Sequence, residues 1–191
     1  SIGSSAFYNC EDITSIVIPD AVTTVSDYAF QNCTSLESVV LSKNTTSIGY
    51  SSFAGCTSLK DVDFSTSLKT IGSYAFDGCK ALTEINLPNS LETIGVYAFK
   101  NCNGITEIVI PDNVTSIGYG AFRGLNKLES ITLPFVGYEE DSINSDGVLG
   151  YIFDYSTSSF EKSDETNSLL SNTFRSSIPS PIPMNLIGTL N

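Results

Sequence analysis

The sequence predicts a β-rich solenoid, in which short units of equal length stack along one axis, with an irregular insertion at the C-terminal end. Three observations predict it: a fixed 23-residue period, an alternation of apolar residues within each unit, and the loss of both patterns after residue 136. A unit of this length cannot form a core alone, so neighbouring units must bury their apolar edges against each other. We therefore expect each equivalent position to form a column along the stack.

The cysteines mark the period, because each lies 23 residues after the one before: Cys10, Cys33, Cys56, Cys79 and Cys102. Phenylalanines keep the same step: Phe7, Phe30, Phe53, Phe76, Phe99 and Phe122. The unit reads x-x-L-x-x-I-x-L-P-x-x-V-x-x-I-G-x-x-A-F-x-x-C, with five complete copies over 11–125. A 23-residue period built on L-x-x-I-x-L is typical of leucine-rich-repeat solenoids.

Each part of the unit predicts a local structure. The I-x-L step has period two, so it predicts a short strand with both apolar side chains inward. The Thr-Ile-Gly stretch, as in Thr70–Gly72, predicts a second short strand, and its glycine predicts a turn with positive φ where a Cβ would clash. The Ala-Phe-x-x-Cys segment predicts a short helical turn. A threonine or serine directly precedes the valine or isoleucine of the second predicted strand, and it suits an exposed strand face: Thr24, Ser47, Thr70, Thr93 and Ser116.

The unit resembles the BspA-type leucine-rich repeat of bacterial surface antigens, and the resemblance covers residues 1–136. It implies a right-handed solenoid, displayed on a cell surface or secreted, that binds proteins of the host or extracellular matrix, or further copies of itself. It implies adhesion without enzymatic activity and supplies no catalytic motif or cofactor. The stretches Leu133–Gly137 and Gly150–Phe153 also resemble an insertion found between units in this family.

Two domains are expected from the loss of register, a solenoid over 1–136 and an insertion or cap over 137–191. A restart of the repeat near 182–191 and a C-terminal cap are both open at this point. The chain begins part-way through a unit, so we expect it to be a segment of a longer chain with further units upstream.

Composition excludes several classes of function. The 191 residues include 21 acidic and 9 basic side chains, a net charge of −12, which argues against nucleic acid or an anionic membrane as partner. No apolar run approaches the roughly 18 residues of a membrane span, so no membrane insertion is expected. Histidine is absent, which excludes catalytic triads and metal sites that need imidazole.

The cysteine column predicts buried free thiols. Leu125 fills the same position in the fifth complete unit, so the pocket is apolar, and a free cysteine there acts as a small hydrophobe. A disulfide between neighbouring units and a zinc site are the alternatives, but the odd count and the lack of C-x-x-C disfavour them.

The candidate partner-binding face comprises outward residues of the first strand in three successive units: Asp61, Asp63, Glu84, Asn86 and Glu107. Carboxylates stacked at strand spacing repel one another unless a cation or a basic partner offsets them. The face has four possible interpretations: a solvated acidic surface, a site for a basic protein partner, a site for a divalent cation, or the active site of a paired-carboxylate hydrolase. A structural spacer or stalk is the alternative to a binding module.

Tyrosines precede the Ala-Phe pair in five units: Tyr28, Tyr50, Tyr74, Tyr97 and Tyr119. They occupy two adjacent positions of the unit, so we do not expect a single column. Such side chains cover the edge of a core or contact a partner.

Overall fold

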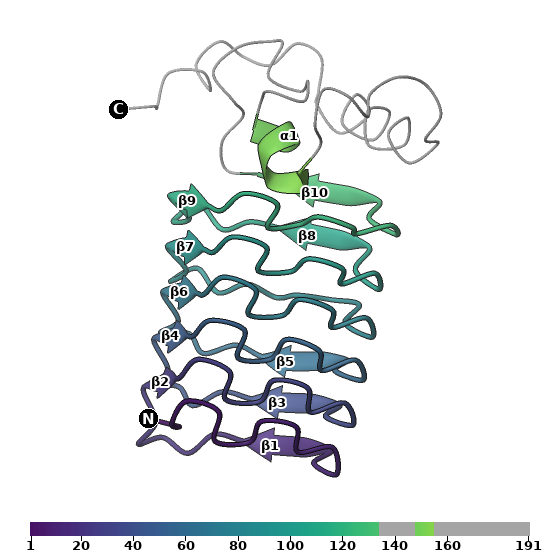
Figure 1. Cartoon of the computed structure of the whole chain (residues 1–191). Coiled ribbons are helices and arrows are strands. Elements are labelled where there is room, and N and C mark those ends of the chain that lie inside the picture. Colours follow the sequence, from purple (N-terminus) through teal and green to yellow (C-terminus); the bar gives the residue numbers. More distant parts are fainter. Residues whose placement is uncertain (134–147, 155–191) are drawn as a thin grey trace, which may run out of the picture.

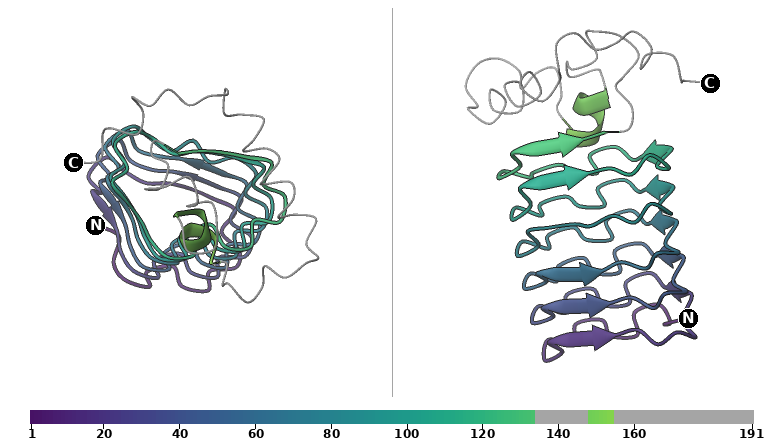
Figure 2. Two further views of the ribbon diagram at one scale, coloured as in Figure 1. Left: turned by 90° about the horizontal axis from the view of Figure 1, so that it is seen from above. Right: turned by 180° about the vertical axis from the view of Figure 1, so that it is seen from behind.

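The structure is a computed structural model that describes residues 1–133 and 148–154. The chain winds into stacked coils of 23 residues, numbered coils 1 to 5 for 11–33, 34–56, 57–79, 80–102 and 103–125, with coil 6 beginning at 126. The stack is seen from the side in Figure 1, and the coils superimpose when it is viewed from above in Figure 2. The predicted 23-residue solenoid is confirmed.

Two sides of the stack carry the strands. The first-strand face holds three-residue strands, namely β1 (Ser15–Val17), β3 (Ser38–Val40), β5 (Asp61–Asp63), β8 (Glu107–Val109) and β10 (Ser130–Thr132). The second-strand face holds two-residue strands, namely β2 (Thr24–Val25), β4 (Ser47–Ile48), β6 (Thr70–Ile71), β7 (Thr93–Ile94) and β9 (Ser116–Ile117). Every strand pair is parallel, and paired residues lie one period apart, so equivalent positions do form columns.

The two faces differ in continuity. On the second-strand face the sheet runs through all five complete coils in the order β2-β4-β6-β7-β9. On the first-strand face it is divided into β1-β3-β5 and β8-β10, because coil 4 has no strand there. Figure 1 shows this coil crossing between β5 and β8 without an arrow.

The phenylalanine column forms the centre of the core. From Phe7 to Phe122 successive rings stack nearly parallel, with centroids 4.9 to 5.9 Å apart. Phe76 also meets Phe64, which follows β5, edge to face at 5.8 Å. The column therefore contacts the interior of the first-strand face as well as its own neighbours.

The Ala-Phe-x-x-Cys segment forms successive β-turns where we expected a helical turn. In coil 1 the amides of Ala29 and Gln31 close turns onto the carbonyls of Ser26 and Tyr28, at 3.3 and 3.1 Å. The amide of Phe30 instead donates to Ser52 of the next coil at 2.7 Å. Alternate amides thus bond between coils, and the positive φ of 60° at Tyr28 interrupts any helix.

The glycine before the Tyr position is needed for space, and the positive φ expected there lies two residues later. A Cβ on Gly95 would lie 2.4 Å from the amide nitrogen of Ser73 in the preceding coil. The φ values of +48 to +60° occur instead at Ser51, Tyr74, Tyr97 and Gly120 among others. The prediction of a clash is confirmed, but the assignment of the left-handed residue was wrong by two positions.

The chain lies on the stack again at α1 (Val148–Phe153). The amides of Gly120 and Phe122 donate to the carbonyls of Tyr151 and Ile152, each at 2.9 Å. The Phe153 ring lies 6.2 Å from that of Phe122, so it continues the phenylalanine column. Residues 134–147 and 155–191 lie outside the described residues, and with them the expected boundary at 136 and the expected restart over 182–191.

Candidate binding face

The structure brings the five predicted site residues together on the first-strand face of coils 3 to 5. Asp61 and Asp63 are the end residues of β5, and Glu107 begins β8. Glu84 and Asn86 lie between them on coil 4, and all five side chains are exposed. Within the described residues, none of the four carboxylates forms an ion pair or accepts a hydrogen bond. The face therefore carries negative charge that the described part of the chain leaves unpaired.

The first-strand sheet is interrupted at the two places where pairing would bring one carboxylate opposite another. Register pairs form where Ser38 faces Asp61 and where Ser130 faces Glu107. No pair joins Asp61 to Glu84 or Glu84 to Glu107, the two rungs at which carboxylate would face carboxylate. Two unit charges about 5 Å apart repel by roughly 1 kcal/mol even in water, which is comparable to the net worth of a backbone hydrogen bond. Repulsion of this size weakens the ladder at these two positions.

A groove of about 500 Å³ lies at this break, between coils 4 and 5. Its lining residues include Glu84, Asn86, Thr106, Glu107 and Val109. Over 1–133 and 148–154, no basic side chain lines it. Asp61 and Asp63 lie on the same face but outside the groove.

The carboxylates do not converge on a metal ion. Within residues 1–133 and 148–154, no group of three or more potential ligands is arranged to hold one. The acids project instead as an extended row across three coils, a geometry that suits contacts with a surface more than coordination of a point charge.

The tyrosines form one continuous row, contrary to the sequence expectation. Successive rings from Tyr28 through Tyr50, Tyr74, Tyr97 and Tyr119 to Tyr151 lie 5.2 to 5.6 Å apart. The tyrosines alternate between two neighbouring positions of the unit, but the backbone has a positive φ there. The side chains from both positions therefore lie in one row. The Lys100 ammonium lies 5.1 Å from the centre of the Tyr97 ring, within the range of a cation–π contact.

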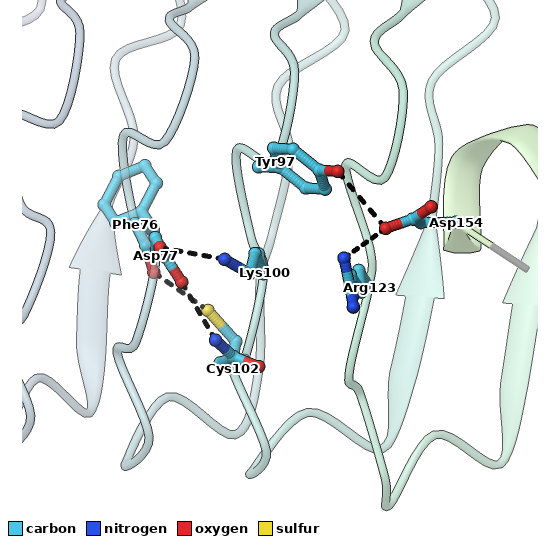
Figure 3. Close-up of polar contacts among 8 residues, drawn as sticks. Phe76, Asp77, Tyr97, Lys100, Cys102, Arg123 and Asp154 are labelled. Atoms are coloured by element: carbon cyan, nitrogen blue, oxygen red, sulfur yellow. Dashed lines mark hydrogen bonds and ion pairs between the residues drawn. The ribbon is translucent and has the colours of Figure 1, made fainter.

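A polar cluster attaches the residue after α1 to the stack. The Tyr97 hydroxyl donates to Asp154 Oδ2 at 3.2 Å, and Arg123 Nη1 pairs with the same oxygen (Figure 3). Partial burial and the nearby carboxylate raise the pKa of Tyr97. Asp154 directly follows α1, so these bonds hold the helix against coils 4 and 5.

The five cysteines are free, as predicted, and all except the half-buried Cys10 are buried. Each buried thiol donates to a phenylalanine carbonyl of the preceding coil, as from Cys102 to Phe76 at 3.1 Å in Figure 3. Burial raises the pKa of Cys56 to about 12 and raises that of Cys79 well above its ordinary value. The thiols are therefore packing groups with a weak donor, held in the protonated form.

A family model described as a BspA type leucine-rich repeat region, with six copies, matches residues 1–129 and 93–146. The chain belongs to the BspA-type leucine-rich repeat family. The resemblance drawn from the repeat unit is thus confirmed. No curated protein matches the chain.

Solved structures of bacterial leucine-rich repeat proteins are similar to this BspA-type chain. A leucine-rich repeat protein of T. pallidum is 35% identical, with a TM-score of 0.63, over 64% of this chain and 59% of its own. One from Bacteroides ovatus is 38% identical, with a TM-score of 0.58, over 63% and 33%. A leucine-rich cell surface protein of Faecalibacterium prausnitzii is 30% identical, with a TM-score of 0.50, over 69% and 42%. The matches thus span 59% or less of these relatives.

The sequence did not indicate the groove. The sequence does place acids at equivalent positions of three successive units, which predicts repulsion, but repulsion alone does not say whether strands stay paired.

In the part of the chain that is described, no helix is long and apolar enough to cross a membrane.

Proposed function

We propose that this chain is a non-enzymatic protein-binding module, used for adhesion on a cell surface or in the extracellular space. The observation that carries the proposal is the exposed acidic face of coils 3 to 5, whose carboxylates have no cationic partner among the described residues. The stacked core holds these charges at fixed spacing. A partner with matching basic groups would gain many modest contacts, and binding would not require the entropy cost of ordering the solenoid.

Display outside the cell is supported by the F. prausnitzii neighbour, which is described as a cell surface protein. The partner class we propose is a protein of the host or extracellular matrix with a basic surface. Electrostatic attraction of this kind accelerates association and weakens as salt is added.

A hydrolase is disfavoured by the position of the acids. A paired-carboxylate mechanism needs one carboxyl group whose pKa is raised by an enclosing cleft. Asp61, Asp63, Glu84 and Glu107 are exposed, where water screens and solvates the charged form.

The second candidate is a structural spacer in a longer surface protein, with the active domain elsewhere. The unbroken second-strand face and the continuous phenylalanine column favour it, because both give a stiff rod. We further propose that 137–191 forms an insertion or cap distinct from the solenoid over 1–136. The return of Ile152 and Phe153 to the stack supports an insertion that packs on the solenoid end.

Binding of the purified chain to an array of purified extracellular-matrix proteins separates the two candidates. The wild type is compared with a variant carrying D61N, D63N, E84Q and E107Q, which keeps the size of each side chain. A binding module should retain specific matrix proteins, and the variant and higher salt should weaken that retention. No retention of any matrix protein would leave the spacer as the function. Equal specific retention of both proteins would mean that binding does not use the acidic face. Sedimentation of the chain alone tests self-association.

A further inference from the structure

The backbone of Thr83–Leu87 in coil 4 is not hydrogen-bonded to the coils on either side. In other coils the residue before the first strand donates backwards, as Lys60 does to Glu37 at 2.9 Å and Glu129 does to Thr106 at 2.7 Å. The residue after the strand donates forwards, as Leu41 does to Asp63 at 3.0 Å. None of these bonds has a counterpart at Thr83–Leu87. Among the residues that the structure describes, the carbonyl and amide groups of this stretch therefore have no backbone partner on the acidic face.

The opening is local, because the coils are held together around it. Immediately before the groove, coil 5 presses on coil 4: a Cβ at Gly104 would lie 2.5 Å from the Leu82 carbonyl oxygen. On the opposite face Thr93 pairs in register with both Thr70 and Ser116. An additional strand would need coils 4 and 5 to separate by a full strand width, about 4.8 Å, which these contacts prevent. The groove has room for a side chain, not for a strand.

The groove offers hydrogen-bond acceptors in one place. Glu84, Glu107 and Asn86, whose side chains carry acceptor oxygens, line it together with Ile85 and Leu87 of the stretch that has no backbone bond to the neighbouring described coils. Val109, Pro111 and Leu87 add apolar surface beside them. A guanidinium group matches this combination, since it is planar, carries five donors, bonds carboxylates in pairs and packs on apolar surface. A lysine ammonium presents only three donors and is more strongly hydrated.

We propose that the groove between coils 4 and 5 is an anchor pocket for an arginine side chain from an extended, basic segment of a partner protein. The guanidinium bonds the carboxylates of Glu84 and Glu107 together with backbone carbonyls of coil 4. Further basic residues of the same segment lie across Asp61 and Asp63 on β5. This inference rests on the proposed binding function and names the chemistry of its partner.

Fluorescence anisotropy with two labelled peptides tests the pocket: four Arg-Gly-Ser repeats, and four Lys-Gly-Ser repeats of equal charge. The wild type should bind the arginine peptide several-fold more tightly. E84Q/E107Q should weaken its binding by at least about tenfold, because both charged acceptors are lost. D61N/D63N is the matched control, since it removes two charges from the same face outside the groove, and should weaken binding by less than about threefold. Thermal unfolding of both variants checks that they fold.

Each other result overturns the pocket in a recognisable way. Equal losses in the two variants would mean that only the general charge of the face matters, which leaves the proposed binding function intact. Equal affinity for both peptides would exclude a guanidinium site. Failure of the wild type to bind the arginine peptide would also overturn it, whereas the proposed function fails only if the matrix array is negative. Amide shifts in the NMR spectrum should concentrate at 83–87 and 106–109 when the arginine peptide binds.

Discussion

The two faces of the solenoid are built from the same 23-residue coils, yet one sheet is continuous and the other is divided. On the second-strand face hydroxyl side chains stack from Thr24 to Ser116, and the sheet joins all five coils. On the first-strand face the sheet stops where Asp61, Glu84 and Glu107 would stack. Pairing on the first-strand face is thus lost where outward carboxylates would face each other.

The largest effect is expected from Phe76→Ala, which removes a ring from the middle of the phenylalanine column. Phe76 is fully buried and contacts Phe53, Phe99 and Phe64. We expect the free energy of unfolding to fall by about 3–5 kcal/mol, measured by urea denaturation. Phe7→Ala is the control at the half-buried end of the column and should cost less. If amide exchange shows one face opening while the other stays protected, the faces do not share a core.

High pH should weaken the interior that lies behind both faces. Folding raises the pKa of Cys56 from 9.0 to about 12, so the folded state holds its proton where the unfolded chain has lost it. This contribution of Cys56 is complete below pH 9 and decreases as the pH rises toward 12, by roughly 1 kcal/mol at pH 10. Cys56→Ala should therefore flatten the loss of stability between pH 8 and 10, relative to wild type. Identical slopes for Cys56→Ala and the wild type would contradict the proposed thiol contribution.

Moving the acids to the other face should divide the second sheet. The variant T70D/T93E/S116E places carboxylates on three successive rungs of β6, β7 and β9. Two new acid–acid rungs should lower the free energy of unfolding by roughly 1–2 kcal/mol and expose the amides there to hydrogen exchange. Retained protection would mean that coil 4 is unpaired for a reason other than charge.

The smallest effect is the reverse change, Glu84→Thr, which removes the central carboxylate of the acidic column. Both acid–acid rungs disappear, so Thr83–Leu87 should gain amide protection, and stability should rise by about 0.5–1 kcal/mol. Glu129→Thr makes the same change of charge at a position that faces Thr106, and should give no such gain. A stabilisation of equal size in the control would point to net charge in place of the rung.

The columns could be predicted from the sequence because a strict period fixes which side chains meet, whatever the path between them. The buried thiols followed from Leu125 in the same position. The tyrosine row was not predicted, since its continuity depends on the positive φ of residues such as Tyr74 and Tyr97. Tyrosine at these positions does not indicate a positive φ. The missing strand of coil 4 was also beyond the pattern, because Glu84 and Asn86 keep the alternation while their charge and polarity weaken the pairing.

The return of the insertion to the stack shows what the solenoid tolerates. Phe153 lies 31 residues after Phe122, where every earlier step is 23, yet it occupies the next place in the column. Lengthening a connection from 23 to 31 residues costs only about 0.3 kcal/mol in loop-closure entropy. A longer connection therefore costs little free energy where the residues that follow it place a tyrosine in the tyrosine row and a phenylalanine in the phenylalanine column. Related proteins could diversify by exchanging such excursions while their supporting rod stays the same.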